Sequence, residues 1–190
     1  MRRLLDVLLL EHGADAPSFP TIVAAGSNAS MPHATPSDRV IQGNDLVIID
    51  FGATFEGYHS DTTRTIKANN RDFSAPEARI IEAVLSSHQR GVSEMKPGKT
   101  GGEVDLCVRR TFSEEDEPFF IHGLGHGLGL QIHEYPFIVP NSNDDIAPRN
   151  VATIEPGLYF PGNCGVRIED SYVISKDENT RLSRLPLVIA

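Results

Sequence analysis

The 190-residue chain has little cysteine, fewer basic than acidic residues and no long apolar run, and each shortage excludes a class of protein. Two cysteines, Cys107 and Cys164, are too few for a disulfide framework and form no C-x-x-C pair, which favours a reducing compartment. Lys and Arg number 17 against 26 Asp and Glu, and the formal net charge of -9 argues against binding nucleic acid by neutralising phosphates. No segment approaches membrane-spanning length. We therefore expect neither nucleic acid nor a membrane as a partner.

Length and composition predict one globular domain. Hydrophobic residues make up 39% of the chain and charged residues 23%, which is ordinary for a domain with one core. The first five residues, MRRLL, faintly resemble a signal peptide, but Asp6 and Glu11 interrupt any apolar region and no small-residue cleavage site follows. We therefore expect a cytoplasmic location.

Hydrophobic periodicity and turn residues predict an α+β domain with a mainly antiparallel sheet. A helix is expected over residues 2–12, ended by Gly13, with its apolar face on a sheet. Capping-box patterns at Ser74 and Thr100 predict helices that run to about residues 94 and 111. Short runs predict strands at residues 21–25, 46–51, 58–67, within 122–134, and at 136–139, 151–155, 166–174 and near Leu187. The order helix, strands, two helices, strands favours α+β over alternating βαβ units.

Residues 122–134, HGLGHGLGLQIHE, place three histidines on a backbone with glycine at alternate positions. Each glycine would cost a helix roughly 1 kcal/mol relative to alanine, so His122 and His126 are not expected to share a helical face. Glycine instead lets an extended backbone approach a ligand closely, and histidines supply neutral nitrogen ligands or proton-transfer groups. The alternative is a tight glycine-rich connection with solvated histidines. A dinucleotide-binding loop is disfavoured by the glycine spacing and by Pro136 and Pro140.

Four acidic residues lie on or beside predicted strands. They form two similarly spaced pairs, Asp50 with Asp61 and Glu155 with Glu169, each across a predicted hairpin. Asp50 ends a buried run, where its charge needs a cation, and Arg64 or Arg167 could supply it. Taken singly, the others have ordinary explanations, as turn, strand-end and surface charges: Asp61, Glu155 and Glu169.

Together with His126, these four carboxylates are a sufficient ligand set for two adjacent divalent ions. An oxygen-rich site with one imidazole suits Mn, Co, Fe or Zn. Two such ions polarise a carbonyl and lower the pKa of a shared water, which is the chemistry of amide hydrolysis.

Five segments carry a resemblance to a known family: residues 49–52 (IDFG), 57–65 (GYHSDTTRT), 122–134, 153–157 (TIEPG) and 165–170 (GVRIED). In this combination and order the chain resembles metallopeptidase family M24, in the branch of prolidase and aminopeptidase P. The resemblance implies the pita-bread fold, with a curved, mainly antiparallel sheet, helices on its outer face and two pseudo-symmetric halves. It also implies that residues 1–190 form a single catalytic domain without the N-terminal domain and first helix usual in that branch.

The resemblance further assigns roles. Asp50 and Asp61 would bind one ion, His126 and Glu155 the other, and Asp61 and Glu169 would bridge the two. Manganese is the first choice of metal, with Co, Zn or Fe as alternatives. The remaining roles are a proton acceptor, Glu155; a hydrogen-bond donor to the scissile carbonyl, His133; substrate-binding or proton-shuttling histidines, His33 and His122; and an arginine that orients the ligand carboxylates, Arg167. His59 and His88 are expected to be surface histidines.

The activity implied is hydrolysis of the Xaa-Pro bond in dipeptides or at peptide N-termini, so the expected partner is a peptide with proline at its second position. The complete histidine pattern favours this over methionine removal, and retention of all five ligands argues against the metal-free relatives of creatinase type. Two alternatives stay open, a non-catalytic pita-bread module that binds peptides or proteins, and an inactive fragment of a longer peptidase. A homodimer is the candidate assembly.

Overall fold

The computed structural model describes residues 1–35, 37–70 and 72–188, and its described part confirms the α+β prediction. Helices α1 (Arg2–Glu11), α2 (Ala75–Glu94) and α3 (Gly101–Arg109) accompany four small sheets in which every pair of strands is antiparallel. Short 3-10 turns lie at η1 (Gly26–Ser30), η2 (Ala68–Asn70) and η3 (Glu117–Phe119). Within the described ranges, no helix combines the length and the hydropathy needed to cross a membrane.

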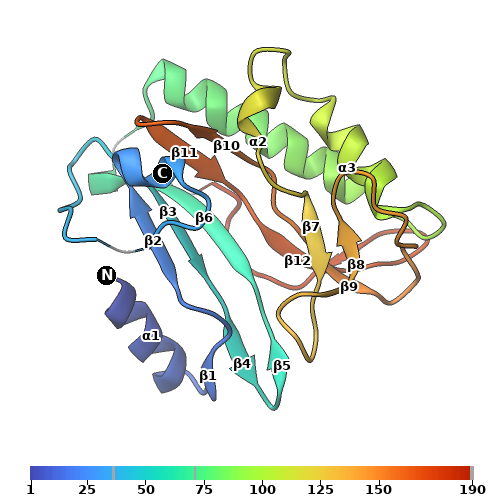
Figure 1. Ribbon diagram of the computed structural model, residues 1–190. Helices are drawn as coiled ribbons and strands as arrows, with labels where there is room; N and C mark the ends of the chain where they lie inside the picture. Colours follow the sequence, from blue (N-terminus) through green and yellow to red (C-terminus); the bar gives the residue numbers. More distant parts are fainter. Residues whose placement is uncertain (36, 71, 189–190) are drawn as a thin grey trace.

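The N-terminal half is built on a three-stranded sheet in the order β2-β3-β6 (Figure 1). Its strands are β2 (Ile22–Ala25), β3 (Leu46–Phe51) and β6 (Thr62–Lys67), and β1 (Ala16–Pro17), β4 (Ala53–Phe55) and β5 (Tyr58–His59) form a smaller sheet beyond its end. The β-branched run of β3 makes it the central strand, since such side chains pack well on a pleated surface that is covered.

The C-terminal half has a five-stranded sheet in the order β13-β12-β9-β7-β8 and a separate β10-β11 hairpin. The strands are β7 (Gly125–Gly127), β8 (Glu134–Ile138), β9 (Val151–Ile154), β10 (Gly157–Phe160), β11 (Cys164–Arg167), β12 (Asp170–Val173) and β13 (Thr180–Arg181). The strand predicted over residues 166–174 is therefore two strands. The chain leaves its pairing with β10 and joins β9 between them, with Glu169 at the change of sheet.

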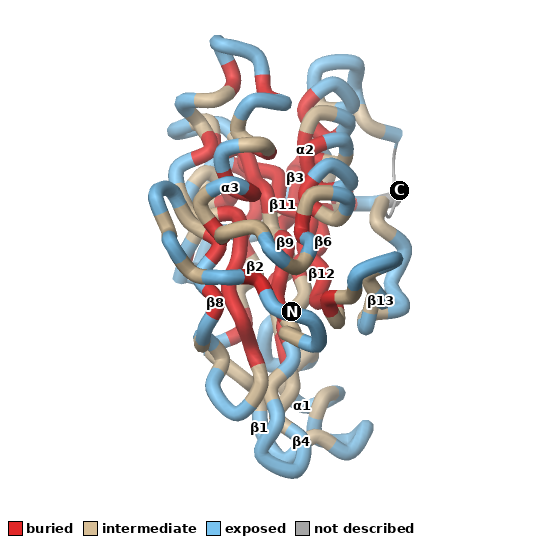
Figure 2. Tube along the Cα trace, turned by 90° about the vertical axis from the view of Figure 1, so that its right-hand side faces the viewer, coloured by how far each residue is buried: buried red, intermediate tan, exposed pale blue. Residues whose placement is uncertain are grey.

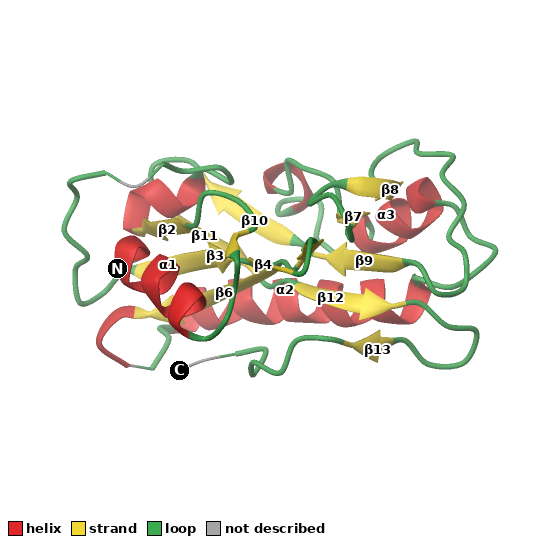
Figure 3. Cartoon of the chain, turned by 90° about the horizontal axis from the view of Figure 1, so that it is seen from below, coloured by secondary structure: helices red, strands yellow, loops and turns green. Residues whose placement is uncertain are grey.

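Helices α2 and α3 cover the outer face of the strands, as Figures 1 and 3 show. Both predicted capping boxes are present, Ser74 with Glu77 and Thr100 with Glu103, so each helix begins where the sequence indicated. Figure 2 shows the buried residues concentrated in the strands and on the inner side of α2. The main apolar core lies between these layers and includes Ile81, Val84, Val104, Val108, Leu124, Ile154, Leu158 and Val166.

Helix α1 ends close to the predicted position, but the expected burial of its apolar face on a sheet is wrong. None of its residues is buried, and Leu4 is 61% exposed. The helix packs beside β1 at the edge of the fold, where a hydrogen bond from Thr21 Oγ1 to Asp6 Oδ1 (2.6 Å) also holds it. An amphipathic pattern thus identified the helix but not the surface that covers it.

The strand predicted near Leu187 is also absent from the described residues, and residues 189–190 lie outside them. The backbone carbonyls of Leu185 and Pro186 accept hydrogen bonds from the Arg64 side chain (3.2 and 2.6 Å). Pro186 has no N–H to donate to a ladder, so this segment binds a side chain instead of pairing as a strand.

Candidate metal centre

A cavity of about 450 Å³ lies between the two halves of the chain and is lined by every site residue that the sequence indicated. The lining residues include the five proposed ligands, the three proposed substrate histidines and Arg167: His33, Asp50, Asp61, His122, His126, His133, Glu155, Arg167 and Glu169. Segments far apart in sequence therefore meet at one surface.

Strand geometry explains how the four carboxylates meet. Asp50 lies on β3 opposite Thr63, and Glu155 directly follows β9 with its N–H bonded to the carbonyl of Leu124 (2.8 Å). Asp61 and Glu169 occupy equivalent places in the two halves, because each immediately precedes a strand at which the chain changes from one sheet to another. At such a change the side chain is not confined to one sheet face.

The tightest group is formed by Asp61, His126 and Glu169, which offer ligand atoms all within 4.8 Å of one another. His126 Nε2 lies 3.6 Å from Asp61 Oδ2 and 3.4 Å from Glu155 Oε1. The other ring nitrogen, Nδ1, is 3.0 Å from the carbonyl oxygen of Gly127 and is best assigned as the donor there. That tautomer leaves the Nε2 lone pair directed at the carboxylates, as a metal ligand requires.

The histidine run adopts the extended form that its glycines predicted. Residues 125–127 form β7, between β8 and β9, so His122 and His126 do not lie on a helix. A Cβ added to Gly125 would lie 2.2 Å from the carbonyl oxygen of Thr153 on the neighbouring strand. Glycine is therefore required here by the close approach of two backbones, which brings His126 beside the end of β9.

Burial and the charges of neighbouring carboxylates raise the pKa values of three carboxyl groups in the cluster. Burial, then the nearby charges of Asp50 and Glu155, raises the pKa of Asp61 well above its ordinary value. Burial, then Asp61 and Glu155, does the same to the pKa of Glu169, and burial is the main cause that raises the pKa of Glu155 to about 8. Burial lowers the pKa of His126 to about 4. Full ionisation of these carboxyl groups would therefore place more negative charge in the cluster than the surrounding cationic groups balance.

The cluster fits divalent cations because two of its buried oxygen atoms lack hydrogen-bond donors in the described structure. Asp50 Oδ2 accepts a hydrogen bond from Arg167 Nη2 (2.6 Å), and Glu169 Oε2 accepts one from Thr63 Oγ1 (2.6 Å). The second oxygen of each, Asp50 Oδ1 and Glu169 Oε1, is buried without a hydrogen-bond partner in the described structure. Buried carboxylate oxygens without donors are costly, and a hard cation would satisfy them.

Arg167, one of the two predicted partners of Asp50, begins a chain of hydrogen bonds along one wall of the cavity. Its Nη1 donates to the hydroxyl of Tyr159 (2.7 Å), which lies 2.8 Å from His122 Nε2. His122 Nδ1 is 2.7 Å from the carbonyl oxygen of Gly123, so both ring nitrogens of His122 are engaged. Burial lowers the pKa of His122 to about 3, which keeps the ring neutral.

Tyr159 is a site residue that the sequence reasoning missed. It stands in a short apolar run, Gly157–Phe160, where its ring suggested only core packing. The available signal was its hydroxyl, because a buried tyrosine usually finds a hydrogen-bond partner and so marks a polar neighbour.

His33 and His133 also line the cavity, whereas the prediction for His88 is wrong. The rings of His126 and His133 meet edge to face with centroids 4.3 Å apart, and His33 reaches the cavity from the loop after η1. His88 was predicted to be exposed but is buried at 1% exposure, since it lies one helical turn after Val84 on the inner face of α2. His59 is half-buried beside Thr54.

Comparisons with known proteins place the chain among metallopeptidases. The sequence model of metallopeptidase family M24 matches residues 1–176. An Xaa-Pro dipeptidase of Pyrococcus furiosus is 41% identical over 181 residues, covering 95% of this chain and 51% of the relative.

Solved structures give the same picture. Prolidase from Pyrococcus furiosus superposes with a TM-score of 0.93 at 39% identity, covering 97% of this chain and 55% of the other. X-Pro aminopeptidase from Thermotoga maritima gives 0.93 at 35% identity, covering 98% and 53%. The pita-bread architecture is thereby confirmed, and the chain spans about half the length of the relatives it matches.

Proposed function

Because this chain belongs to metallopeptidase family M24, we propose that it is the catalytic portion of a dinuclear-metal peptidase that cleaves Xaa-Pro bonds. The observation that carries the proposal is the convergence of four carboxylates and His126 on one cavity, with unpartnered carboxylate oxygens between them. The names of the relatives, Xaa-Pro dipeptidase and X-Pro aminopeptidase, support the choice of bond.

The residues present fit two ions with shared ligands. Asp50 and Asp61 would hold one ion, His126 and Glu155 the other, and Asp61 with Glu169 would contact both. The donor set of carboxylates and one imidazole makes manganese our first choice, with Co, Zn or Fe as alternatives. When bound, such ions polarise the scissile carbonyl and make water a stronger acid.

The side chains around the cluster supply proton transfer and orientation. Glu155, which directly follows β9 and lines the cavity, would accept a proton from the attacking water and pass it to the leaving proline nitrogen. His133 lies edge to face with His126 and would donate a hydrogen bond to the scissile carbonyl. Arg167 holds Asp50 in place through its hydrogen bond to Oδ2.

The substrate would bind along the cavity wall. His33 and His122 would contact the peptide, and because both nitrogens of His122 are already engaged, its ring would contribute packing and orientation more than proton shuttling. The rest of the wall carries apolar side chains suited to a proline ring and its neighbours, namely Phe19, Pro20, Ile22, Ile132, Phe137 and Val139.

A substrate panel tests the proposal. The protein is stripped with a chelator, reloaded separately with Mn, Co, Zn or Fe, and given Ala-Pro, a longer peptide beginning Ala-Pro, its Ala-Ala counterpart and a peptide beginning with Met. We expect metal-dependent cleavage of the proline substrates, absent from an Asp61→Ala variant. Absence of metal-dependent cleavage with every peptide would refute the peptidase proposal for this chain.

The same panel separates the alternatives. Stoichiometric metal binding and tight peptide binding without turnover would indicate a binding module, and neither property would indicate an inactive fragment. The single-domain description of residues 1–190, homodimer formation and a cytoplasmic location stay predictions alongside the proposed activity.

A further inference from the structure

The two halves of the chain meet at a seam between β6 and β12 that is built largely from side chains. In the described structure these strands share one isolated bridge, Thr63 with Glu169, in place of a continuous ladder. The Glu169 N–H donates to the Thr63 carbonyl (3.1 Å), and Ser171 Oγ donates to the Asp61 carbonyl (3.1 Å). The two ligands proposed to contact both ions, Asp61 and Glu169, therefore lie at the seam itself.

Arg64 fills this seam and uses every hydrogen-bond donor it has. The side chain is buried at 2% exposure, on the strand that begins directly after Asp61. A guanidinium carries five N–H donors in a fixed plane. Here they reach five acceptors on both sides of the seam. Nη1 donates to the carbonyls of Thr63 (2.7 Å) and Glu169 (2.6 Å). Nη2 donates to Asp170 Oδ1 (2.6 Å) and the carbonyl of Leu185 (3.2 Å), and Nε donates to the carbonyl of Pro186 (2.6 Å).

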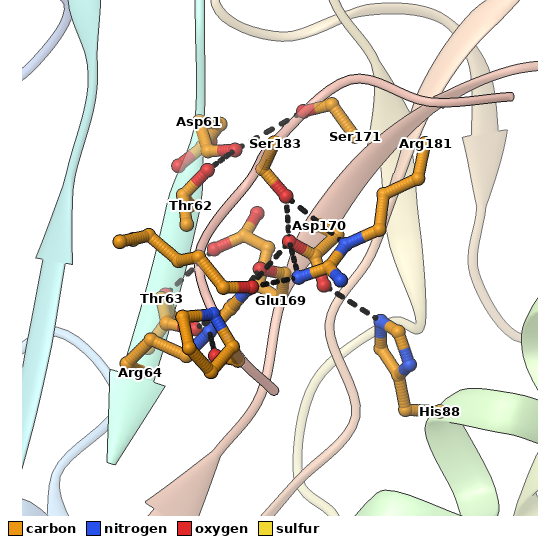
Figure 4. Close-up of polar contacts among 12 residues, drawn as sticks. Asp61, Thr62, Thr63, Arg64, His88, Glu169, Asp170, Ser171, Arg181 and Ser183 are labelled. Atoms are coloured by element: carbon orange, nitrogen blue, oxygen red, sulfur yellow. Dashed lines mark hydrogen bonds and ion pairs between the residues drawn. The ribbon is translucent and has the colours of Figure 1, made fainter. Parts of the chain in front are cut away.

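Asp170 anchors the opposite side. It follows Glu169 directly, its side chain is fully buried, and its Oδ1 accepts hydrogen bonds from Arg64, Arg181 (3.1 Å) and Ser183. Figure 4 shows these partners converging on the carboxylate, with His88 of α2 approaching Oδ2 at 3.6 Å. Three donors on Oδ1 hold this oxygen in place, and Arg64 also binds the carbonyl of Glu169, so the peptide between Glu169 and Asp170 is restrained from both of its residues.

We propose that Arg64 and Asp170 are a positioning pair that sets the separation of Asp61 and Glu169 and thereby the affinity for the two ions. This inference rests on the proposed function. Neither residue lines the cavity, so the pair acts through the backbone of the ligands: Arg64 binds the carbonyl of Glu169 and lies on the strand that begins directly after Asp61. Loss of a partner that orients metal ligands typically weakens metal binding about 10–100-fold.

The test compares Arg64→Lys and Arg64→Met with the unchanged protein. Lysine keeps the charge but has three donors and no planar fork, so it cannot serve both sides of the seam. We expect isothermal titration of the stripped protein with Mn²⁺ to show at least one site weakened about 10–100-fold in both variants, more in Arg64→Met. We also expect the visible absorption of bound Co²⁺ to change, because that spectrum reports ligand geometry.

Two controls separate positioning from loss of stability. Ile80→Ala removes apolar packing from the outer core, and its urea unfolding is measured in chelator beside that of the Arg64 variants. Arg79→Lys changes a second Arg-Asp pair, with Asp116, and neither residue lines the cavity. Both controls should keep the Mn²⁺ affinity and the Co²⁺ spectrum of the unchanged protein, whatever their unfolding free energies.

The outcomes are distinct. If the unchanged protein binds metal and Arg64→Lys binds it equally well with the same Co²⁺ spectrum, the positioning role is wrong and the proposed function survives. If the unchanged protein binds no divalent ion, both fail. Should the Arg64 variants not fold, Ser183→Ala removes a single donor to Asp170 and should still weaken Mn²⁺ binding. An unchanged affinity in that variant would overturn the proposal.

Discussion

Stripping the ions should make the protein lose stability as the pH rises through neutrality, the reverse of ordinary acid denaturation. The cause is the raised pKa of the buried carboxyl groups. Glu155 has an ordinary pKa of 4.5 and a folded pKa of about 8, so between these values the unfolded chain releases a proton that the folded chain keeps. Stability from this group is complete below pH 4.5 and is lost as the pH rises to about 8.

The buried histidines oppose this trend, but in a lower pH range. Burial lowers the pKa of His122 to about 3 and of His88 and His126 to about 4, against an ordinary value of 6.5. These groups therefore add stability as the pH rises through 6.5, and their contribution is nearly complete about one pH unit above that value. From pH 6.5 to about 8, Glu155 alone should lower the unfolding free energy by about 2 kcal/mol, at about 1.4 kcal/mol per pH unit. Asp61 and Glu169 act in the same direction.

Urea unfolding in chelator, measured from pH 5 to 8.5, gives the assay. A maximum at about pH 7 or below and a fall towards about pH 8.5 are expected, and Mn²⁺ in excess should abolish the fall because the ions replace the protons. Glu155→Gln, which cannot ionise, should show a smaller decline. A stripped protein whose unfolding free energy stays level or increases between about pH 7 and 8.5 would refute the account of an overcharged cluster.

Three further predictions concern the cavity wall and its strands. His33→Ala should leave metal content unchanged and reduce turnover, and loss of metal in elemental analysis would contradict a substrate-binding role. Gly125→Ala would place a methyl 2.2 Å from the Thr153 carbonyl, so urea unfolding should show a loss of about 1–3 kcal/mol or more, whereas an unchanged midpoint would show that β7 can move. Tyr159→Phe should cost about 1–3 kcal/mol by leaving buried partners unsatisfied, and a neutral effect would mean that His122 finds another donor.

Much of the fold followed from local signals in the sequence. The capping boxes at Ser74 and Thr100 marked the starts of two helices, because capping is decided within one turn of chain. The glycines of residues 123–129 correctly excluded a helix for His126, since their conformational cost is also local. The resemblance then brought together the residues that the structure places around one cavity.

Features decided by distant partners were not predictable. The apolar face of α1 was visible in the sequence, but the surface beside it was not. No local pattern in the sequence shows that α2 turns His88 towards Asp170, so the prediction of a surface histidine is wrong. The sequence suggests Arg64 as a partner for Asp50, whereas its acceptors include Glu169 and Asp170 on the far side of the seam.

The seam between β6 and β12 also affects how late in folding the ligand cluster is completed. Arg64 and Asp170 are 106 positions apart in sequence, and contacts of such span form slowly because the closure of a long loop must precede them. A chain emerging from the ribosome with only its first half folded would carry Asp50 and Asp61 but no imidazole ligand from β7. We therefore expect ion binding to be among the last events of folding, so that an incompletely folded copy would hold no ions at this cluster.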